Sequence, residues 1–301
     1  MPELPEVEIV RSSLQREFVG KKIKTATVNK GAFVSRHKAV KDFRALAEGR
    51  TIKAVQRIGV SLVCSLDNDT HLVISLNGSS QLRKAASAKD EKPKHTHAVF
   101  TFTTNDELRV VDAHESAQMF VTMPRNPEQD VTISKYARLA VGGDGVGIRK
   151  SVVELSQLGI DILEDQLGWD RFAAIVRSRS EGIKSVLTND EIFTGLGSLY
   201  ADEVLFVANI RFDRSSESLS TIEIRRLHRT LTEVVLEAIK AGGTSMGAEP
   251  FLNIDGVAGS YQNQLLVVGR EGLPCDTCRT PIQKVAYDKQ PTYFCPKCQS
   301  A

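Results

Sequence analysis

The sequence contains no apolar run approaching the roughly 18 residues that a membrane-spanning helix requires. Its start also lacks the positive charge and apolar stretch of a secretory signal, because Glu3, Glu6 and Glu8 stand there instead. The net charge is only +2, so a nucleic-acid binder of this composition has to concentrate its positive charge locally. We expect a cytoplasmic protein without membrane association.

The 301 residues are enough for two or three domains, and a hydrophobic content of 41% is ordinary for a soluble globular protein. The first residues lead straight into a helix, since Pro5 suits a first helical turn. Apolar residues then recur at helical spacing at Val7, Val10, Leu14 and Phe18. Gly20 ends this pattern.

Residues 22–125 read as a sheet-rich domain, a sandwich or a barrel, because short apolar or alternating runs are separated by turn signals such as Asn77-Gly78. A basic insert at 83–97 lies between two of these runs and is predicted to be a mobile loop. Residues 126–150 read as a linker with glycine and proline.

Helical periodicity dominates from about 151 to 242. Helices are predicted in the segments 155–165, 169–179, 183–190, 198–210 and 221–243. The last is the longest; Ser220 and Glu223 form a capping box before it, and Gly242-Gly243 ends it.

Four of the five cysteines lie in the last 27 residues, as two Cys-x2-Cys pairs separated by 16 residues. Two thiolate pairs on two tight turns suit a tetrahedral Zn²⁺ site, whereas two disulfides are the alternative. A closed four-cysteine site has a structural role. The segment between the pairs reads as a hairpin, and the predicted ligands are Cys275, Cys278, Cys295 and Cys298.

Gly195 and Gly197 directly precede a helix that starts near Ser198. Exposed amides at a helix N-terminus bind anions such as phosphate. A tight, closely packed turn between two helices explains the same pattern, so both interpretations stay open here.

The PELPE start, the segment GLGSLYADEVLF and the cysteine-rich tail together resemble the formamidopyrimidine-DNA glycosylase and endonuclease VIII family. The resemblance extends over essentially the whole chain. It implies an α+β fold with an N-terminal β-sandwich and leading helix, a helix–two-turns–helix domain, and a C-terminal zinc-ribbon hairpin. The domains expected are 1–125, catalytic; 126–150, a linker; 151–263, DNA-binding; and 264–301, the zinc finger.

The same resemblance implies a role for the first residues. Methionine is removed, and the Pro2 amine attacks C1′ of a damaged nucleoside, expels the base and forms a Schiff base, after which elimination cuts the strand. Glu3 is expected to protonate the sugar or shuttle protons. Glu6 and Glu203 match acidic positions that help hold the N-terminus, and Lys184 matches a lysine near the damaged site.

Several positions depart from the family pattern. Val60 replaces a lysine, and the residues expected to fill the space left by an extruded base become Gly78, His114 and Ser116, with Glu115 between the last two. The DNA contacts expected from the resemblance lie at Gly195, Gly197, Ser198, Gln290 and His114; Ser198 and Gln290 replace an asparagine and an arginine. A loop that folds over the extruded base is placed within 245–262.

Two functions are therefore expected. The first is a base-excision repair enzyme, a DNA glycosylase and abasic-site lyase acting through Pro2 and Glu3, with weakened lesion excision. The alternative is a catalytically impaired member that binds damaged or unusual DNA. Either is expected to hold one structural Zn²⁺, to act as a monomer associated with the nucleoid, and to bind damaged, abasic or single-stranded DNA.

Overall fold

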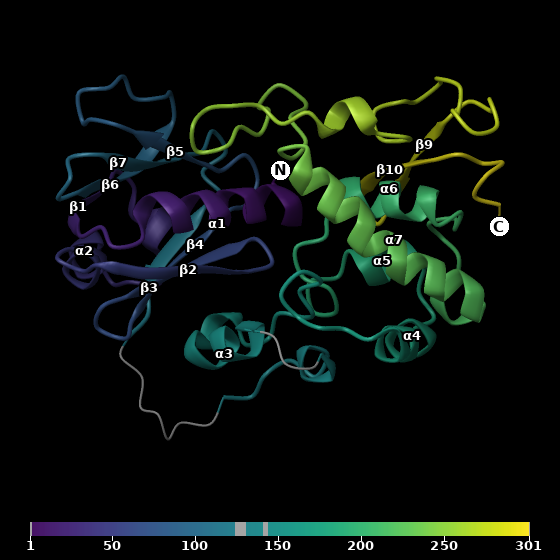
Figure 1. The fold of residues 1–301 in the computed structure, drawn as a ribbon, viewed down its shortest axis with the longest axis horizontal. Helices are drawn as coiled ribbons and strands as arrows, with labels where there is room; N and C mark the ends of the chain where they lie inside the picture. Colours follow the sequence, from purple (N-terminus) through teal and green to yellow (C-terminus); the bar gives the residue numbers. More distant parts are fainter. Residues whose placement is uncertain (1, 124–130, 141–143, 301) are drawn as a thin grey trace.

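The computed structural model describes residues 2–123, 131–140 and 144–300. Figure 1 shows a sandwich of strands on one side, a group of helices on the other, and the N-terminus between them. Among the described residues, none of the helices has both the length and the apolar character to cross a bilayer.

The first helix, α1 (Leu4–Phe18), confirms the predicted amphipathic helix. The Glu3 and Glu6 side chains form a capping box at its start, and Pro5 occupies its first turn. The predicted apolar residues are all buried, and Gly20 turns the chain away with a φ of +85°. Burial of this face fixes α1 against the sandwich, which holds the first residues in place.

The sandwich consists of two four-stranded antiparallel sheets, in the orders β1-β6-β7-β5 and β2-β3-β4-β8. The apolar face of α1 shares one core with side chains from both sheets. The strands are β1 (Ile23–Val28), β2 (Ile52–Ile58), β3 (Ser61–Leu66), β4 (His71–Ser75), β5 (Gln81–Ala85), β6 (Thr96–Phe102), β7 (Glu107–Val111) and β8 (Gln118–Val121), with helix α2 (Val40–Ala47) beside β1.

The basic insert 83–97 is only partly a loop, since its ends belong to β5 and β6. The remainder is fastened by the buried guanidinium of Arg109, which donates to the backbone carbonyls of Ser87, Asp90 and Glu91 at 2.7–3.3 Å. The structure also places a helix, α3 (Asp144–Ser151), in the segment predicted as a linker. Ile148 of α3 is buried against the outer side of β2, β3 and β4.

The helical lobe contains α4 (Trp169–Arg177), α5 (Ile183–Leu187), α6 (Ser198–Val207) and α7 (Thr221–Lys240). The Ser220–Glu223 capping box of α7 is confirmed. The prediction of a helix over 155–165 is wrong. The Asp161 carboxylate accepts the Leu163 and Glu164 amides, and Gly159 lies so close to the Ile192 backbone that a Cβ would sit 2.4 Å from it. Side-chain hydrogen bonds and close packing therefore replace helical ones.

The segment 245–262 crosses from the helical lobe to the sandwich. Phe251 and Ile254 are buried in the sandwich core, and the Ile254 carbonyl accepts the Lys84 amide of edge strand β5 at 2.7 Å. None of these residues lines the cavity described below. In this structure the segment 245–262, called the strap below, connects the two lobes, and its folding over an extruded base stays a prediction.

The C-terminal segment forms the predicted hairpin, with β9 (Gln283–Tyr287) paired antiparallel to β10 (Gln290–Phe294). Asp288 and Lys289 make the tight turn with φ values of +48° and +63°. The Ser185 hydroxyl bonds the Tyr287 hydroxyl at 3.2 Å, so the tip of the hairpin rests on α5.

Candidate active site and zinc ribbon

A cavity of about 590 Å³ lies where the start of α1, the sandwich, the helical lobe and the hairpin meet. The sandwich contributes Val60, Leu76 and Asn77 to its wall. The other groups that line it include Pro2, Glu3, Lys184, Asp190, Ser198, Asp202, Tyr287, Asp288, Gln290 and Tyr293. The predicted nucleophile and its acid therefore lie in one cavity with Lys184, Ser198 and Gln290.

Glu3 reaches across to the helical lobe, although it belongs to the start of α1. Its carboxylate accepts the backbone amides of Gly197 at 2.9 Å, Leu199 at 3.0 Å and Tyr200 at 3.3 Å. These are amides of the first turn of α6, where the helix leaves donors unpaired and favours negative charge. Glu3 thus fills the anion site that the glycine turn creates.

Burial of the Glu3 carboxyl raises its pKa to about 7, with a further contribution from the neighbouring Glu6. The α6 amides oppose this shift because they stabilise the charged form. A carboxyl with this pKa is divided between its acid and base forms near neutral pH. It is therefore suited to give or take a proton.

Glu6 holds the N-terminus, as the resemblance implies. Its carboxylate accepts the Glu3 amide at 2.9 Å, the Thr244 amide at 2.9 Å and the Tyr200 hydroxyl at 2.5 Å. The Tyr200 hydroxyl also bonds the Thr244 hydroxyl at 2.7 Å. Burial raises the pKa of Glu6. This network ties α1, α6 and the residues after α7 together directly behind the cavity.

Lys184 enters the cavity wall from α5 and is 2% exposed. Its ammonium donates to the Asp202 carboxylate at 2.6 Å, the Thr292 hydroxyl at 2.7 Å and the Ser198 hydroxyl at 2.8 Å. Burial lowers the pKa of Lys184 and raises that of Asp202 to about 6, while their attraction opposes both shifts. The pair joins α5, α6 and the hairpin in one place.

The two glycines have structural tasks here. Gly195 has a φ of +84°, and its carbonyl accepts the Leu4 amide at 2.8 Å. A Cβ on Gly197 would lie 2.4 Å from the Glu3 carboxyl. The two interpretations left open above therefore combine: the turn is closely packed, and the anion at the start of α6 is the Glu3 carboxylate. The prediction that the Gly197 amide contacts DNA does not fit an amide already bonded to Glu3.

Of three other predicted residues, Gln290 shares the cavity with Pro2, whereas Glu203 and His114 do not line it. Glu203 is buried and accepts the amides of Leu266, Val267 and Val268 at 2.8–3.0 Å, so it holds the segment before the zinc ribbon and does not touch Pro2 or Glu3. Gln290 lines the cavity from the hairpin. The His114 side chain is 70% exposed and lies 3.7 Å from Glu249, outside the cavity lining.

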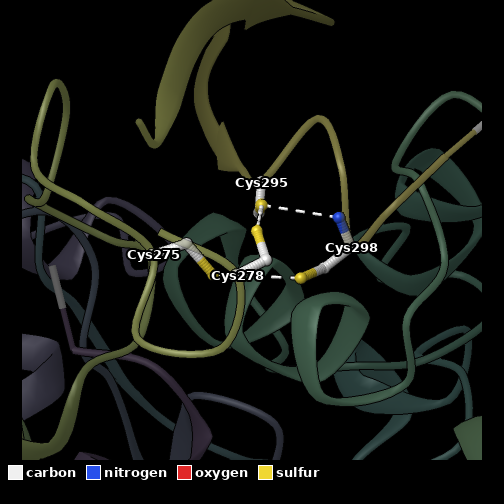
Figure 2. Close-up of side chains that lie close together, drawn as sticks. All are labelled: Cys275, Cys278, Cys295 and Cys298. Atoms are coloured by element: carbon white, nitrogen blue, oxygen red, sulfur yellow. Dashed lines mark hydrogen bonds between the residues drawn. The ribbon is translucent and has the colours of Figure 1, made fainter. Parts of the chain in front are cut away.

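The four predicted cysteines converge at the base of the hairpin (Figure 2). The Sγ–Sγ distances are 3.9 Å for Cys275–Cys298 and 3.4 Å for Cys278–Cys295. A disulfide needs about 2.05 Å, whereas Zn–S bonds of about 2.3 Å in a tetrahedron place sulfurs about 3.8 Å apart. The donor set therefore fits one structural zinc ion and excludes the disulfide alternative.

Asp202 and Tyr200 were not among the predicted site residues. Both lie on α6 in the segment SLYADEV, one turn beyond the glycines. Asp202 was detectable as one of two adjacent acids in a largely apolar helix, since acids buried in such a helix are rare unless they have partners. Tyr200 had no such signal, because a buried tyrosine looks like any core aromatic.

A sandwich with a leading helix, a helical lobe and a four-cysteine ribbon around one shared cavity defines a class of two-lobed zinc-ribbon proteins, and here the start of the chain lies in the cavity wall. Comparison with known proteins agrees with this architecture. The formamidopyrimidine-DNA glycosylase N-terminal domain matches residues 1–119, and the H2TH domain of the same glycosylase matches residues 158–249. The zinc finger found in FPG and IleRS matches residues 272–301.

Relatives match over their full length. The formamidopyrimidine-DNA glycosylase of Listeria monocytogenes is 33% identical, with 99% of this chain and 100% of the relative covered. That of Shouchella clausii is 34% identical, with 99% of each chain covered. The solved MutM (Fpg) protein of Thermus thermophilus has a TM-score of 0.81 and 29% identity over 99% of this chain and 98% of that one.

Lactococcus lactis Fpg, solved in complex with DNA that contains an abasic site, has a TM-score of 0.83 and 27% identity over 99% of this chain and 100% of that one. The chain belongs to the formamidopyrimidine-DNA glycosylase family.

Proposed function

We propose that this protein is a base-excision repair DNA glycosylase that also cleaves at abasic sites, with the Pro2 amine as its nucleophile. The observation that carries the proposal is the placement of Pro2 and Glu3 together in the wall of the shared cavity. Membership of the family, and a relative solved with abasic-site DNA, support it. Because Pro2 and Glu3 are both present and both line the cavity, the alternative of a purely DNA-binding protein is less favoured.

The chemistry follows from a secondary amine at the chain terminus. Once Met1 is removed, the Pro2 nitrogen forms a bond to C1′ while the bond from C1′ to the damaged base breaks, and the base leaves with a proton. Opening of the C1′–O4′ bond gives an iminium ion. The iminium acidifies C2′, and loss of that proton expels the 3′ phosphate and cuts the strand. At an abasic site the same iminium forms with loss of water.

Glu3 is suited to the proton transfers in this sequence. Its neutral form can protonate the sugar oxygen as the ring opens, and its anionic form can accept the C2′ proton. Its pKa of about 7 makes both forms available near neutral pH. The three α6 amides and the Glu6 network restrain its position, which favours reaction because small displacements of reacting groups are costly.

The finer assignments remain part of the proposal. The ligand is DNA containing damage or an abasic site, bound by a monomer in the cytoplasm near the nucleoid. Gln290 and Ser198 are proposed contacts to the DNA backbone because both line the cavity. The Gln290 amide is the donor of the two, since the Ser198 hydroxyl donates to the Pro291 carbonyl at 2.8 Å and has to turn to reach a phosphate. Residues 1–125 and 151–263 are proposed as the catalytic and DNA-binding domains, with 126–150 between them and the zinc finger from 264 to 301.

The test is to trap the iminium. The protein is incubated with DNA containing one abasic site and with borohydride, which delivers hydride to the iminium and leaves a permanent amine crosslink. We expect a crosslinked species with wild type. Binding of the same DNA without a crosslink contradicts the enzyme and supports the binding protein.

Two variants locate the nucleophile. Pro2→Gly keeps a terminal amine, so its crosslink persists at reduced yield, whereas a form with an uncleaved N-terminal extension forms none. Intact mass confirms whether Met1 has been removed in each preparation. If the protein with the N-terminal extension still forms the crosslink, the nucleophile is an amine other than that of Pro2.

A further inference from the structure

The wall that the sandwich presents to the cavity is formed at the end where the loops 76–80 and 112–117 meet. Asn77 lines the cavity, and its carbonyl accepts the Ser116 hydroxyl at 2.7 Å. The Ser79 hydroxyl donates to the Asp112 carboxylate at 3.0 Å. Hydrogen bonds therefore join the two loops into one unit, which borders the cavity that contains Pro2 and Glu3.

This unit has no room for a side chain at its centre. Gly78 has a φ of +58°, which disfavours any other residue. A Cβ at Gly78 would lie 2.4 Å from the Ser116 hydroxyl oxygen. Serine and glycine thus fit each other here, and a larger residue at position 78 requires the Ser116 side chain to shift and a strained backbone at position 78.

The 112–117 loop is drawn inward by a single buried carboxylate. Asp112 accepts the backbone amides of His114, Ser116 and Ala117 at 2.6–3.1 Å. At the tip of this loop, the Glu115 side chain forms an ion pair with Lys30. The loop is therefore rigid and presents a polar outer surface.

Within these two loops the only large apolar side chain is that of Leu76, which is 1% exposed. Proteins that unstack paired DNA insert apolar side chains such as Phe, Leu or Met between base steps. Extruding a paired base costs a few kcal/mol, and the cost is least where the nucleotide is already unpaired. The loops beside Asn77 offer nothing that offsets this cost.

The aromatic groups of the cavity come from the opposite side. Tyr287 at the end of β9 and Tyr293 on β10 line it, so both rings come from the hairpin. Stacking on such rings is tolerant of base identity and is the usual means of holding single-stranded DNA. The hairpin thus offers rings on which an unpaired nucleotide can stack, while the loops 76–80 and 112–117 carry no exposed large apolar side chain that could unstack a base pair.

We propose that the site acts on nucleotides that are already outside a base pair, namely lesions in single-stranded or locally unpaired DNA and abasic sites. This inference rests on the proposed function, and it names the class of substrate that reaches Pro2.

The test presents one lesion in three forms. An oligonucleotide containing Fapy-dG, the lesion present in complexes of the Lactococcus lactis relative, is used single-stranded, fully paired, and paired with a strand mismatched around the lesion. We expect base release at least about tenfold faster from the single-stranded and mismatched forms than from the paired form. Equal or faster release from the paired form overturns the inference, as does release from none of the three.

An abasic site in the same three forms is the control, with borohydride trapping as the readout. Since it has no base to extrude, trapping is expected in all three forms at rates that differ much less. Trapping of abasic DNA together with undiminished release from paired Fapy-dG contradicts only the substrate inference. Absence of trapping in every form contradicts the proposed function itself.

Discussion

The Glu3 carboxylate caps helix α6, with its Oε2 atom 2.9 Å from the Gly197 amide. This joins the third residue of the sequence to a helix nearly two hundred residues away. The first turn of α6 favours a charged carboxylate, whereas burial favours a neutral one. Burial prevails, because the pKa of Glu3 rises to about 7. The helix therefore positions an acid without fully ionising it.

Replacing Gly197 with alanine should separate positioning from folding. The new Cβ would meet the Glu3 carboxyl at 2.4 Å, so Glu3 must move away from the α6 amides. A displacement of about 1 Å at a reacting group costs roughly 100-fold in rate. We expect Gly197→Ala to slow borohydride trapping by about that factor with an unchanged circular dichroism spectrum. Gly168→Ala, where no atom lies within 4 Å, is the control and should retain full trapping.

The raised pKa of Glu3 predicts how stability depends on pH. The folded state holds the Glu3 proton up to about pH 7, whereas an unfolded glutamate releases it near 4.5. The stabilisation is therefore complete below about pH 4.5 and is lost as pH rises through 7, amounting to about 3 kcal/mol at most. Glu3→Gln cannot ionise, so wild type should lose free energy of unfolding relative to this variant between pH 5 and pH 8.

Denaturant unfolding at both pH values measures the difference. A constant gap between wild type and Glu3→Gln would show that the Glu3 carboxyl titrates normally in the folded protein. In the trapping assay, Glu3→Gln should also remove any decline in rate above pH 7 that depends on a neutral Glu3.

Much of the fold was predictable because local patterns and long-range packing agree. The apolar spacing of Val7 and Val10 predicted α1, and the paired cysteines predicted the ribbon and its metal. The resemblance brought Pro2, Glu3 and Lys184 to one site, where the structure also has them.

The remainder depends on partners distant in sequence. The apolar pattern of 155–165 predicted a helix, but Asp161 captures the local amides and bonds the Gly59 amide of the sandwich at 2.7 Å. The glycine turn predicted an anion without naming it, because nothing near Gly197 in the sequence points to Glu3. Glu203 matched an acidic position expected to hold the N-terminus, yet its two carboxylate oxygens accept the three amides of residues 266–268.

The strap, the segment 245–262 that follows α7, should contribute to the stability of the sandwich. Ile254 is 1% exposed in the core of that lobe, although it follows the helical lobe in sequence. Truncating a buried isoleucine to alanine typically costs 2–5 kcal/mol. We expect Ile254→Ala to lower the free energy of unfolding by about that amount. Val257→Ala, in the same segment but 60% exposed, should cost less than about 0.5 kcal/mol. If both variants lowered the free energy of unfolding by similar amounts, burial of Ile254 by the strap would not be what stabilises the sandwich.

Zinc removal should strongly reduce trapping even though none of the four cysteines lines the cavity. The ribbon fold depends on four thiolates, and a piece of this size loses its structure without the ion. Its hairpin supplies Tyr287 and Gln290 to the cavity, and the Thr292 hydroxyl holds the Lys184 ammonium at 2.7 Å. We expect chelation to release one zinc per chain and to reduce trapping of abasic DNA more than tenfold, with recovery when zinc is restored.

Cys298→Ser should behave like the chelated protein, whereas Cys64→Ala, which alters a buried thiol outside the ribbon, should retain both the metal and the crosslink. Full trapping by metal-free protein would show that the hairpin keeps its place without the ion, and that the cavity does not depend on the ribbon.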